Sequence, residues 1–111
     1  MARLMSSTEL HQRMQEDGEE FALVDVRDEE AYQDGHIPAA QSVPLDNLKE
    51  NAEEILNKNR PVVVYGDNHD EPESNSAASV LESMGFRKVS DFDGGVHAWK
   101  RAGFELEADG D

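Results

Sequence analysis

The polar stretch at residues 66–76 holds the densest group of side chains that could do chemistry, and it directly follows an apolar run. Five of its side chains are oxygen or nitrogen donors suited to a divalent cation: Asp67, His69, Asp70, Glu71 and Glu73. Their spacing matches no calcium-binding loop, because the glycine that makes the sharp turn of such a loop is missing. We therefore predict a solvated acidic loop and no metal site.

Hydroxyl and imidazole groups in the same stretch raise the alternative of nucleophilic catalysis. Ser74 or Ser76 could act as a nucleophile with His69 as its general base. The sequence names no third residue that would orient such a base, so a simpler role is favoured. A helix is predicted from residue 77 onward, and Ser74 or Asn75 is a suitable cap for its amino terminus.

Two separated phrases resemble the rhodanese family. The first reads Leu-Val-Asp-Val-Arg-Asp-Glu-Glu-Ala-Tyr from residue 23 and continues as Gly-His-Ile-Pro-Ala-Ala at 35–40; the second reads Gly-Gly-Val-His-Ala-Trp at 94–99. In this family a cysteine thiolate at the end of a central strand carries persulfide sulfur between a donor and an acceptor. The resemblance covers about residues 7–108. It implies an α/β fold in which residues 1–111 form a single domain, with a mostly parallel central sheet and helices on both faces.

The chain, however, contains no cysteine. In one rhodanese subgroup the loop after the central strand reads Tyr-Cys, four residues, Cys-Pro, then Ser and Ala-Ala. Laid on residues 65–78 without a gap, this pattern puts Gly66 at the first cysteine and Glu71 at the second. Sulfur transfer requires a thiolate, and glycine provides no nucleophile. We therefore expect no catalytic residue and no sulfurtransferase activity.

The interpretation that we favour is a rhodanese-like binding or regulatory module, whose acidic loop recognises a cation or a basic segment of a partner protein. The predicted binding loop contains Gly66, Asp67, Asn68, His69, Asp70, Glu71, Ser74, Asn75 and Ser76. Two enzymatic alternatives stay open: sulfur transfer that uses the thiol of a partner protein, and a hydrolase or metal-dependent activity from Ser74 and His69. A third alternative is a diverged paralogue with no dedicated ligand.

The resemblance also implies roles for residues outside the loop. Asp25 and Arg27, at the end of a predicted strand, would brace neighbouring loops through charge-assisted hydrogen bonds. His36 belongs to a turn in which its imidazole is expected to be a hydrogen-bonded part of the scaffold. Ala39 stands where many members of the family have glycine, and Trp99 is expected to pack in the core.

Hydrophobic periodicity and cap signals predict the elements that must position these residues. Predicted strands lie at 21–26, 42–44, 62–65 and 89–92. Predicted helices lie at 28–32, 45–57, 77–84 and 96–102, and a first helix begins at the capping-box residues Ser6 to Glu9 and ends at Gly18. Strands that alternate with helices indicate a parallel sheet covered on both faces.

The charge balance limits the classes of partner. The 111 residues include 25 acidic and 10 basic side chains, for a net charge of −15. This charge opposes binding to nucleic acids and to anionic membranes, and it suits a halophilic archaeon, whose salt-rich cytoplasm screens self-repulsion. No apolar run approaches the roughly 20 residues that span a bilayer, and no signal-peptide pattern is present. We expect a cytoplasmic monomer that uses no cofactor and meets an unknown protein partner.

Overall fold

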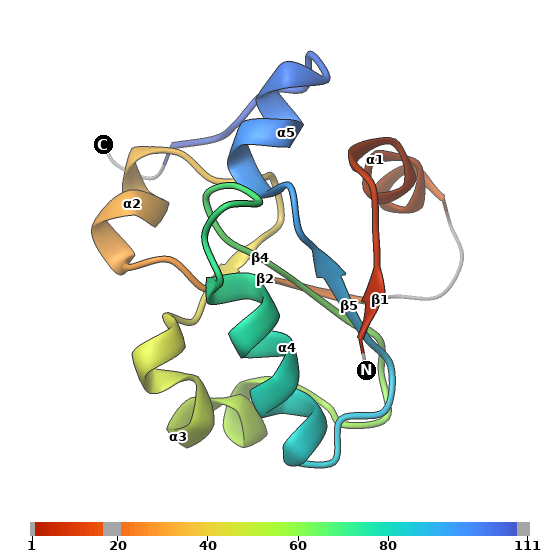
Figure 1. Cartoon of the computed structure of the whole chain (residues 1–111), viewed down its shortest axis with the longest axis vertical. Coiled ribbons are helices and arrows are strands. Elements are labelled where there is room, and N and C mark those ends of the chain that lie inside the picture. Colours follow the sequence, from red (N-terminus) through yellow and green to blue (C-terminus); the bar gives the residue numbers. More distant parts are fainter. Residues whose placement is uncertain (1, 17–20, 109–111) are drawn as a thin grey trace.

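A parallel sheet forms the centre of the computed structural model, which describes residues 2–16 and 21–108 (Figure 1). Within these residues the strands are β1 (Arg3–Leu4), β2 (Ala22–Asp25), β3 (Gln41–Ser42), β4 (Val62–Tyr65) and β5 (Val89–Phe92). Their spatial order is β1-β5-β4-β2-β3, and each neighbouring pair is parallel. The α/β fold predicted from the sequence is therefore confirmed.

Strand β4 lies in the middle of the sheet because all four of its side chains are apolar enough to be buried. Each of them is at most 1% exposed, and the strand pairs with β2 on one side and β5 on the other. A continuous β-branched run is typical of a parallel strand that is covered on both faces. The loop that follows β4 consequently begins from the central, fully buried strand of the sheet.

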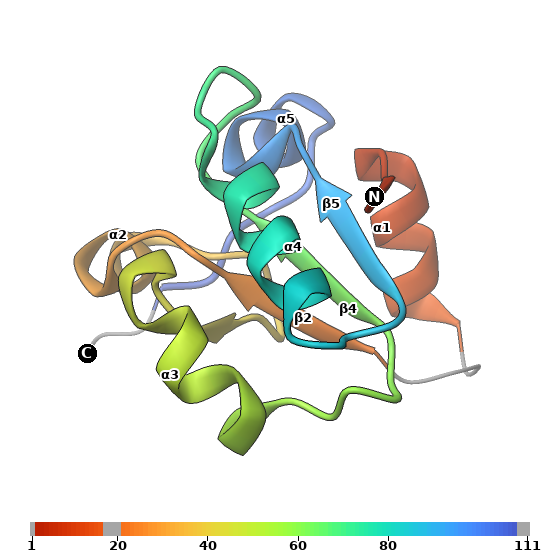
Figure 2. The same cartoon turned by 60° about the horizontal axis from the view of Figure 1, so that its bottom comes forward.

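Five helices among the described residues surround the sheet: α1 (Ser7–Gln15), α2 (Glu29–Asp34), α3 (Leu45–Ile55), α4 (Glu73–Ser83) and α5 (Gly95–Arg101). Helices α3 and α4 cover one face, where Leu48 and Leu81 pack against Val24 and Val64. Helices α1 and α5 cover the other face (Figures 1 and 2). Alternate side chains of β2 and β4 thus enter two separate apolar layers.

Local capping signals account for several element boundaries. The Ser6 hydroxyl accepts a hydrogen bond from the Glu9 N–H at 3.1 Å and begins α1, as its capping-box spacing predicts. Gly85 has a φ of 99°, and the N–H of Phe86 donates to the Leu81 carbonyl at 3.1 Å, which ends α4 with a glycine cap. The predicted stop of the first helix at Gly18 lies outside the described residues.

The structure corrects two predictions. Strand β1 was not expected, because two exposed residues at a sheet edge carry no periodic signal. Helix α4 begins at Glu73 and not at residue 77, so neither Ser74 nor Asn75 is its cap. Pro72 occupies the cap position without a side-chain hydrogen bond. The loop after β4 therefore spans only residues 66–72.

The parallel arrangement brings the site residues to one edge of the sheet. Asp25 and Tyr65, the last residues of β2 and β4, are paired in register. The loop after β4 and the amino termini of α4 and α5 meet at this same edge (Figure 1). Among the residues described, none of the helices has the length and apolar character that crossing a membrane requires.

Candidate functional site

Gly66, the residue directly after β4, has its side-chain position occupied by another residue. A Cβ atom built on Gly66 would lie 2.6 Å from both Cγ and Oε1 of Glu73. The same Oε1 accepts a hydrogen bond from the Asp67 N–H at 3.0 Å. The carboxylate of Glu73 therefore fills the space in which a side chain at position 66 would stand.

The surroundings of Glu73 penalise its ionised form relative to water. Burial raises the pKa of Glu73 above its ordinary value, and the nearby charges of Asp67 and Glu71 raise it further. The Asp67 N–H and the charge of Arg27 act in the opposite direction. Adding a further negative charge to this loop would consequently be unfavourable, because the Glu73 carboxylate already lies there.

Helix α5 holds the loop by its backbone. The N–H of Val96 donates to the Gly66 carbonyl at 3.0 Å, and the N–H of His97 donates to the Asp67 carbonyl at 2.8 Å. Gly95 has a φ of 61°, and a Cβ there would overlap the Gly66 carbonyl oxygen. The first N–H groups of a helix have no partner within the helix, so the loop carbonyls satisfy them and are fixed in return.

Arg27 joins three segments beneath the loop. Its Nη2 atom donates to Asp25 Oδ2 at 2.7 Å and to the Gly35 carbonyl at 2.6 Å, while Nη1 donates to Asp67 Oδ1 at 3.2 Å. Burial opposes ionisation, but the hydrogen bond and charge of Asp25 outweigh it and raise the pKa of Arg27 above its ordinary value. The guanidinium therefore has a structural role, in which it forms ion pairs with the carboxylates of Asp25 and Asp67.

Tyr65 connects β4 to the turn that follows α2. Its hydroxyl oxygen accepts a hydrogen bond from the Ile37 N–H at 3.1 Å. Burial raises the pKa of the Tyr65 phenol above its ordinary value, and the adjacent Asp25 raises it further. The phenol therefore stays neutral and acts as a buried hydrogen-bonding group.

His36 lies within the scaffold. It is 3% exposed, and its Nδ1 atom lies 2.9 Å from the Tyr32 carbonyl oxygen. Its ring stacks on that of Tyr32 with 3.9 Å between centroids, and its backbone pairs with Glu107 through two hydrogen bonds of 2.8 Å. These contacts leave the imidazole inside the fold, away from the loop surface.

The structure does not bring Ser74 and His69 together. Ser74 is 1% exposed and lies next to Asp91 on β5, whereas the His69 side chain is 70% exposed and contacts Asp70 at 3.2 Å. No hydrogen bond joins the serine to the imidazole in the described part of the chain. Asn75 is exposed and Ser76 is half-buried, both in the first turns of α4. The arrangement is unsuited to a serine nucleophile.

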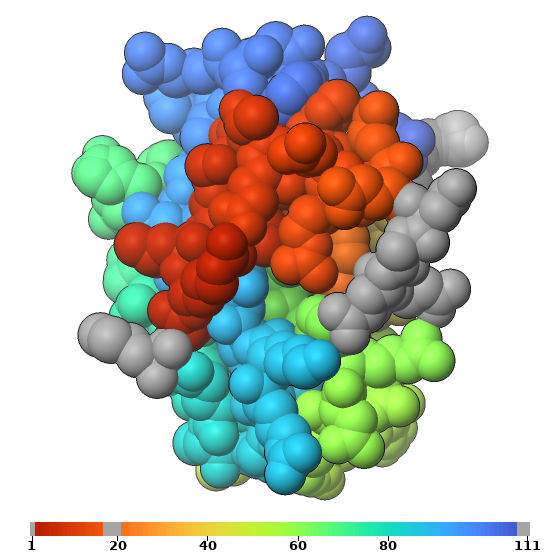
Figure 3. Space-filling model, turned by 90° about the vertical axis from the view of Figure 1, so that its right-hand side faces the viewer, coloured from red at the N-terminus to blue at the C-terminus, as the bar shows by residue number. Residues whose placement is uncertain are grey.

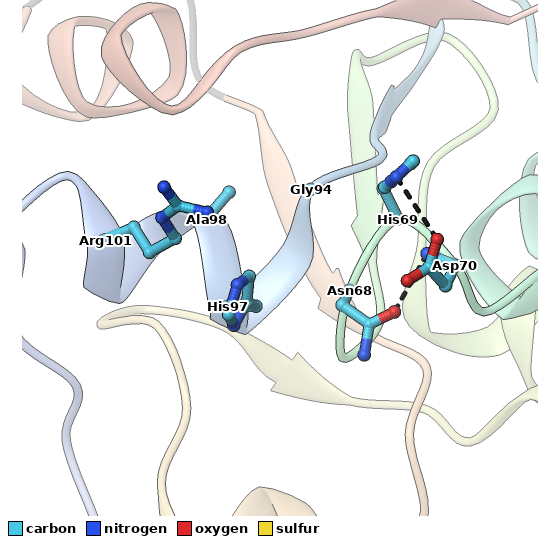
Figure 4. Close-up of a pocket in the computed structure, with 7 residues that line it drawn as sticks. All are labelled: Asn68, His69, Asp70, Gly94, His97, Ala98 and Arg101. Carbon is cyan, nitrogen blue, oxygen red and sulfur yellow. Dashed lines mark hydrogen bonds and ion pairs between the residues drawn. The ribbon is translucent and has the colours of Figure 1, made fainter.

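An open hollow of about 600 Å³ lies between the loop and α5 (Figure 4). The loop contributes Asn68, His69 and Asp70, and α5 with its preceding residue contributes Gly94, His97, Ala98 and Arg101. Sequence reasoning assigned no role to His97 and did not consider Arg101. Their spacing of four residues on one helix was the available signal, because such residues share a face. No group of three His, Asp or Glu side chains suited to a metal ion occurs among the described residues.

Comparisons with known proteins agree with this geometry. Residues 6–102 match the model of the rhodanese-like domain. The thiosulfate sulfurtransferase GlpE of Pseudoalteromonas translucida is 33% identical over 88 residues, covering 78% of this chain and 79% of the relative; that of Pseudomonas savastanoi is 42% identical over 81 residues, covering 70% and 71%. The crystal structure of the Alr3790 protein from Anabaena sp. superposes with a TM-score of 0.86 at 35% identity, covering 94% of this chain and 80% of that one. The chain belongs to the rhodanese-like domain family.

Proposed function

We propose that this chain is a rhodanese-like binding module that does not carry out thiolate-dependent sulfur transfer. The observation that carries the proposal is the Gly66 position, where no nucleophile exists and the Glu73 carboxylate fills the space. Its relatives include proteins named thiosulfate sulfurtransferases. A chain without any cysteine lacks the thiolate on which such transfer depends in this family.

The electrostatics of the loop also oppose an anionic substrate. Glu73 accepts the Asp67 N–H, and the guanidinium of Arg27 is bound to Asp25, Asp67 and a backbone carbonyl. Thiosulfate would meet these carboxylates at a position where most donors of Arg27 are already engaged and Glu73 fills the space beside Gly66. Bringing a like charge into a partly buried site costs more than the same approach in water.

Several exposed carboxylates at this edge suit a cationic partner. We define the acidic rim as Asp67, Asp70, Glu71 and Asp93. The side chains of Asp70 and Asp93 are 85% and 42% exposed, and Asp67 and Glu71 are exposed as well. Because α5 and Arg27 hold the loop in place, the rim is ordered before a partner arrives, which lowers the entropic cost of binding. We infer that the rim binds a Lys- or Arg-rich segment of a partner protein.

A short lysine-rich peptide tests this inference without knowledge of the natural partner. Fluorescence anisotropy would compare peptide binding by the wild type and by Asp70→Asn/Glu71→Gln. At about 0.15 M ionic strength, salt screens the attraction between the peptide and protein charges that lie more than about 8 Å from it. The matched control is Glu50→Gln/Glu54→Gln on α3, which removes the same charge from exposed positions remote from the rim. We expect loss of affinity only in the rim variant. Equal losses in both variants would show that net charge alone attracts the peptide and would reject the rim.

We further propose that the net charge of −15 reflects life in a salt-rich cytoplasm, where the protein acts as a monomer. Self-repulsion among surface carboxylates weakens as the Debye length falls from about 10 Å at 0.1 M to about 3 Å at 1 M salt. The thermal unfolding temperature should therefore rise steeply with potassium chloride. A fold that is equally stable at low and molar salt would contradict salt adaptation.

A further inference from the structure

A second hollow, of about 430 Å³, lies beside the beginnings of β1 and β5. It is separate from the acidic rim, which follows the carboxyl ends of the strands, because Pro61, Val89 and Ser90 line it where β4 and β5 begin. Figure 3 shows this face, with α1 in red to orange above the blue residues that lead into β5. We call it the basic hollow, for the charges that line it.

The charge of the basic hollow runs against the composition of the chain. Among the residues that the structure describes, its lining includes four of the ten Lys and Arg side chains, Arg3, Arg13, Arg87 and Lys88, together with the two carboxylates of Glu9 and Glu82. Acidic residues outnumber basic ones 25 to 10 over the whole sequence. Among the described lining residues, cations therefore outnumber carboxylates, which is the opposite of the balance over the whole sequence.

These four cationic side chains come from different segments of the chain. Arg3 on β1 forms an ion pair with Glu9 on α1, and the guanidinium of Arg13 lies 5.2 Å from the centre of the Phe21 ring. Arg87 and Lys88 come from the connection between α4 and β5, whose backbone is fixed by a 2.9 Å hydrogen bond from the Val62 N–H to the Lys88 carbonyl. The positive groups thus come from β1, α1 and the connection before β5 and line one open hollow.

We propose that the basic hollow binds a compact polyphosphate anion, such as inorganic pyrophosphate or the diphosphate of a nucleotide. The planar guanidinium presents paired N–H donors that match two oxygens of a phosphate group, and three such groups converge here with one ammonium. A diphosphate carries enough charge to engage cations on several walls at once.

Calorimetric titration with inorganic pyrophosphate, at about 0.15 M ionic strength, tests the assignment. We expect saturable binding by the wild type. Arg87→Gln/Lys88→Gln should weaken it by about tenfold or more, because the variant removes two positively charged hydrogen-bond donors from the lining. The matched control, Lys49→Gln/Lys100→Gln, removes the same charge from exposed positions on α3 and α5 and should change affinity less than about twofold.

Three outcomes would overturn the proposal: no saturation by the wild type, equal weakening in both variants, or tighter binding of a glutamate-rich peptide than of pyrophosphate. Amide resonances of the wild type give a second readout that does not depend on how the variants fold. Pyrophosphate should shift those of residues 87–90 and leave those of the loop at 66–72 unmoved. Repeating the titration with a nucleoside diphosphate distinguishes free pyrophosphate from a nucleotide as the ligand. If the nucleoside diphosphate binds more tightly than pyrophosphate, the ligand is a nucleotide.

Discussion

Restoring a cysteine at position 66 should fail to restore chemistry unless Glu73 is removed as well. Gly66 does not have a positive φ, so its backbone accepts an L side chain. The new Cβ would nevertheless lie 2.6 Å from Cγ and Oε1 of Glu73, and 2.9 Å from Cδ. The glutamate must therefore swing outward and give up its hydrogen bond with the Asp67 N–H.

The overlap with Glu73 sets the direction of both effects of Gly66→Cys, and general magnitudes give their approximate size. Loss of a half-exposed charged hydrogen bond costs on the order of 1 kcal/mol, which lowers the unfolding temperature by roughly 4–8 °C in a domain of about 100 residues. A carboxylate left about 4 Å from a thiolate opposes its ionisation by up to about 4 kcal/mol at an effective dielectric constant of 20. Partial exposure reduces this repulsion, so we expect the thiolate population to fall at least about tenfold.

Two assays separate these effects. Thiosulfate-to-cyanide sulfur transfer and the pH dependence of thiol alkylation would be measured for Gly66→Cys and for Gly66→Cys/Glu73→Ala in concentrated potassium chloride. The double variant should transfer sulfur and titrate at lower pH than the single variant. Gly66→Cys/Glu71→Ala is the control, because Glu71 is an exposed carboxylate of the same loop and the three atoms nearest to a Cβ at position 66 all belong to Glu73.

The reasoning would be refuted if the single variant matched the Glu73→Ala double variant in both assays. That result would show that the Glu73 carboxylate does not suppress the ionisation or the reactivity of a thiol at position 66. Turnover by the cysteine-free wild type would refute the proposed function itself, since it would show that sulfur transfer proceeds here without a thiolate.

Three further predictions concern stability. Arg27→Met should destabilise the fold by about 3–5 kcal/mol in urea unfolding, because it leaves the fully buried Asp25 without its partner; a loss below about 1 kcal/mol would contradict this pairing. Burial raises the pKa of Asp91, and neither carboxylate oxygen accepts a hydrogen bond of ordinary geometry, so Asp91→Asn should stabilise at pH 7. The ionised group penalises the fold only above its unfolded pKa of about 4, so this gain should vanish as pH falls below that value. Ala39→Gly should raise the free energy of unfolding by about 1 kcal/mol, since Ala39 has a φ of 73°; an unchanged unfolding midpoint would reject strain there.

Much of the fold was predictable from local signals. The apolar, β-branched run at Val62–Tyr65 indicated a central strand, and β5 lies at the predicted residues 89–92. The beginning of α4 was not predictable in this way. The polar residues after Pro72 suit a loop as well as a solvated first turn of helix, and only packing of the following alanines distinguishes the two.

The sequence by itself determined that no thiolate exists and that the family scaffold is present, because both depend on residue types and their order. Tertiary structure alone decided what occupies the missing side chain's place. Glu73 is seven residues from Gly66, and its carboxylate returns to the loop only because α4 begins directly after Pro72 and points its first residue toward the Asp67 N–H. The basic hollow arises in the same way, since Arg3, Arg13 and Lys88 are distant in sequence and meet only where β1, α1 and β5 pack together. Side chains that are far apart along the chain acquire a shared electrostatic role only when folding places them around one volume.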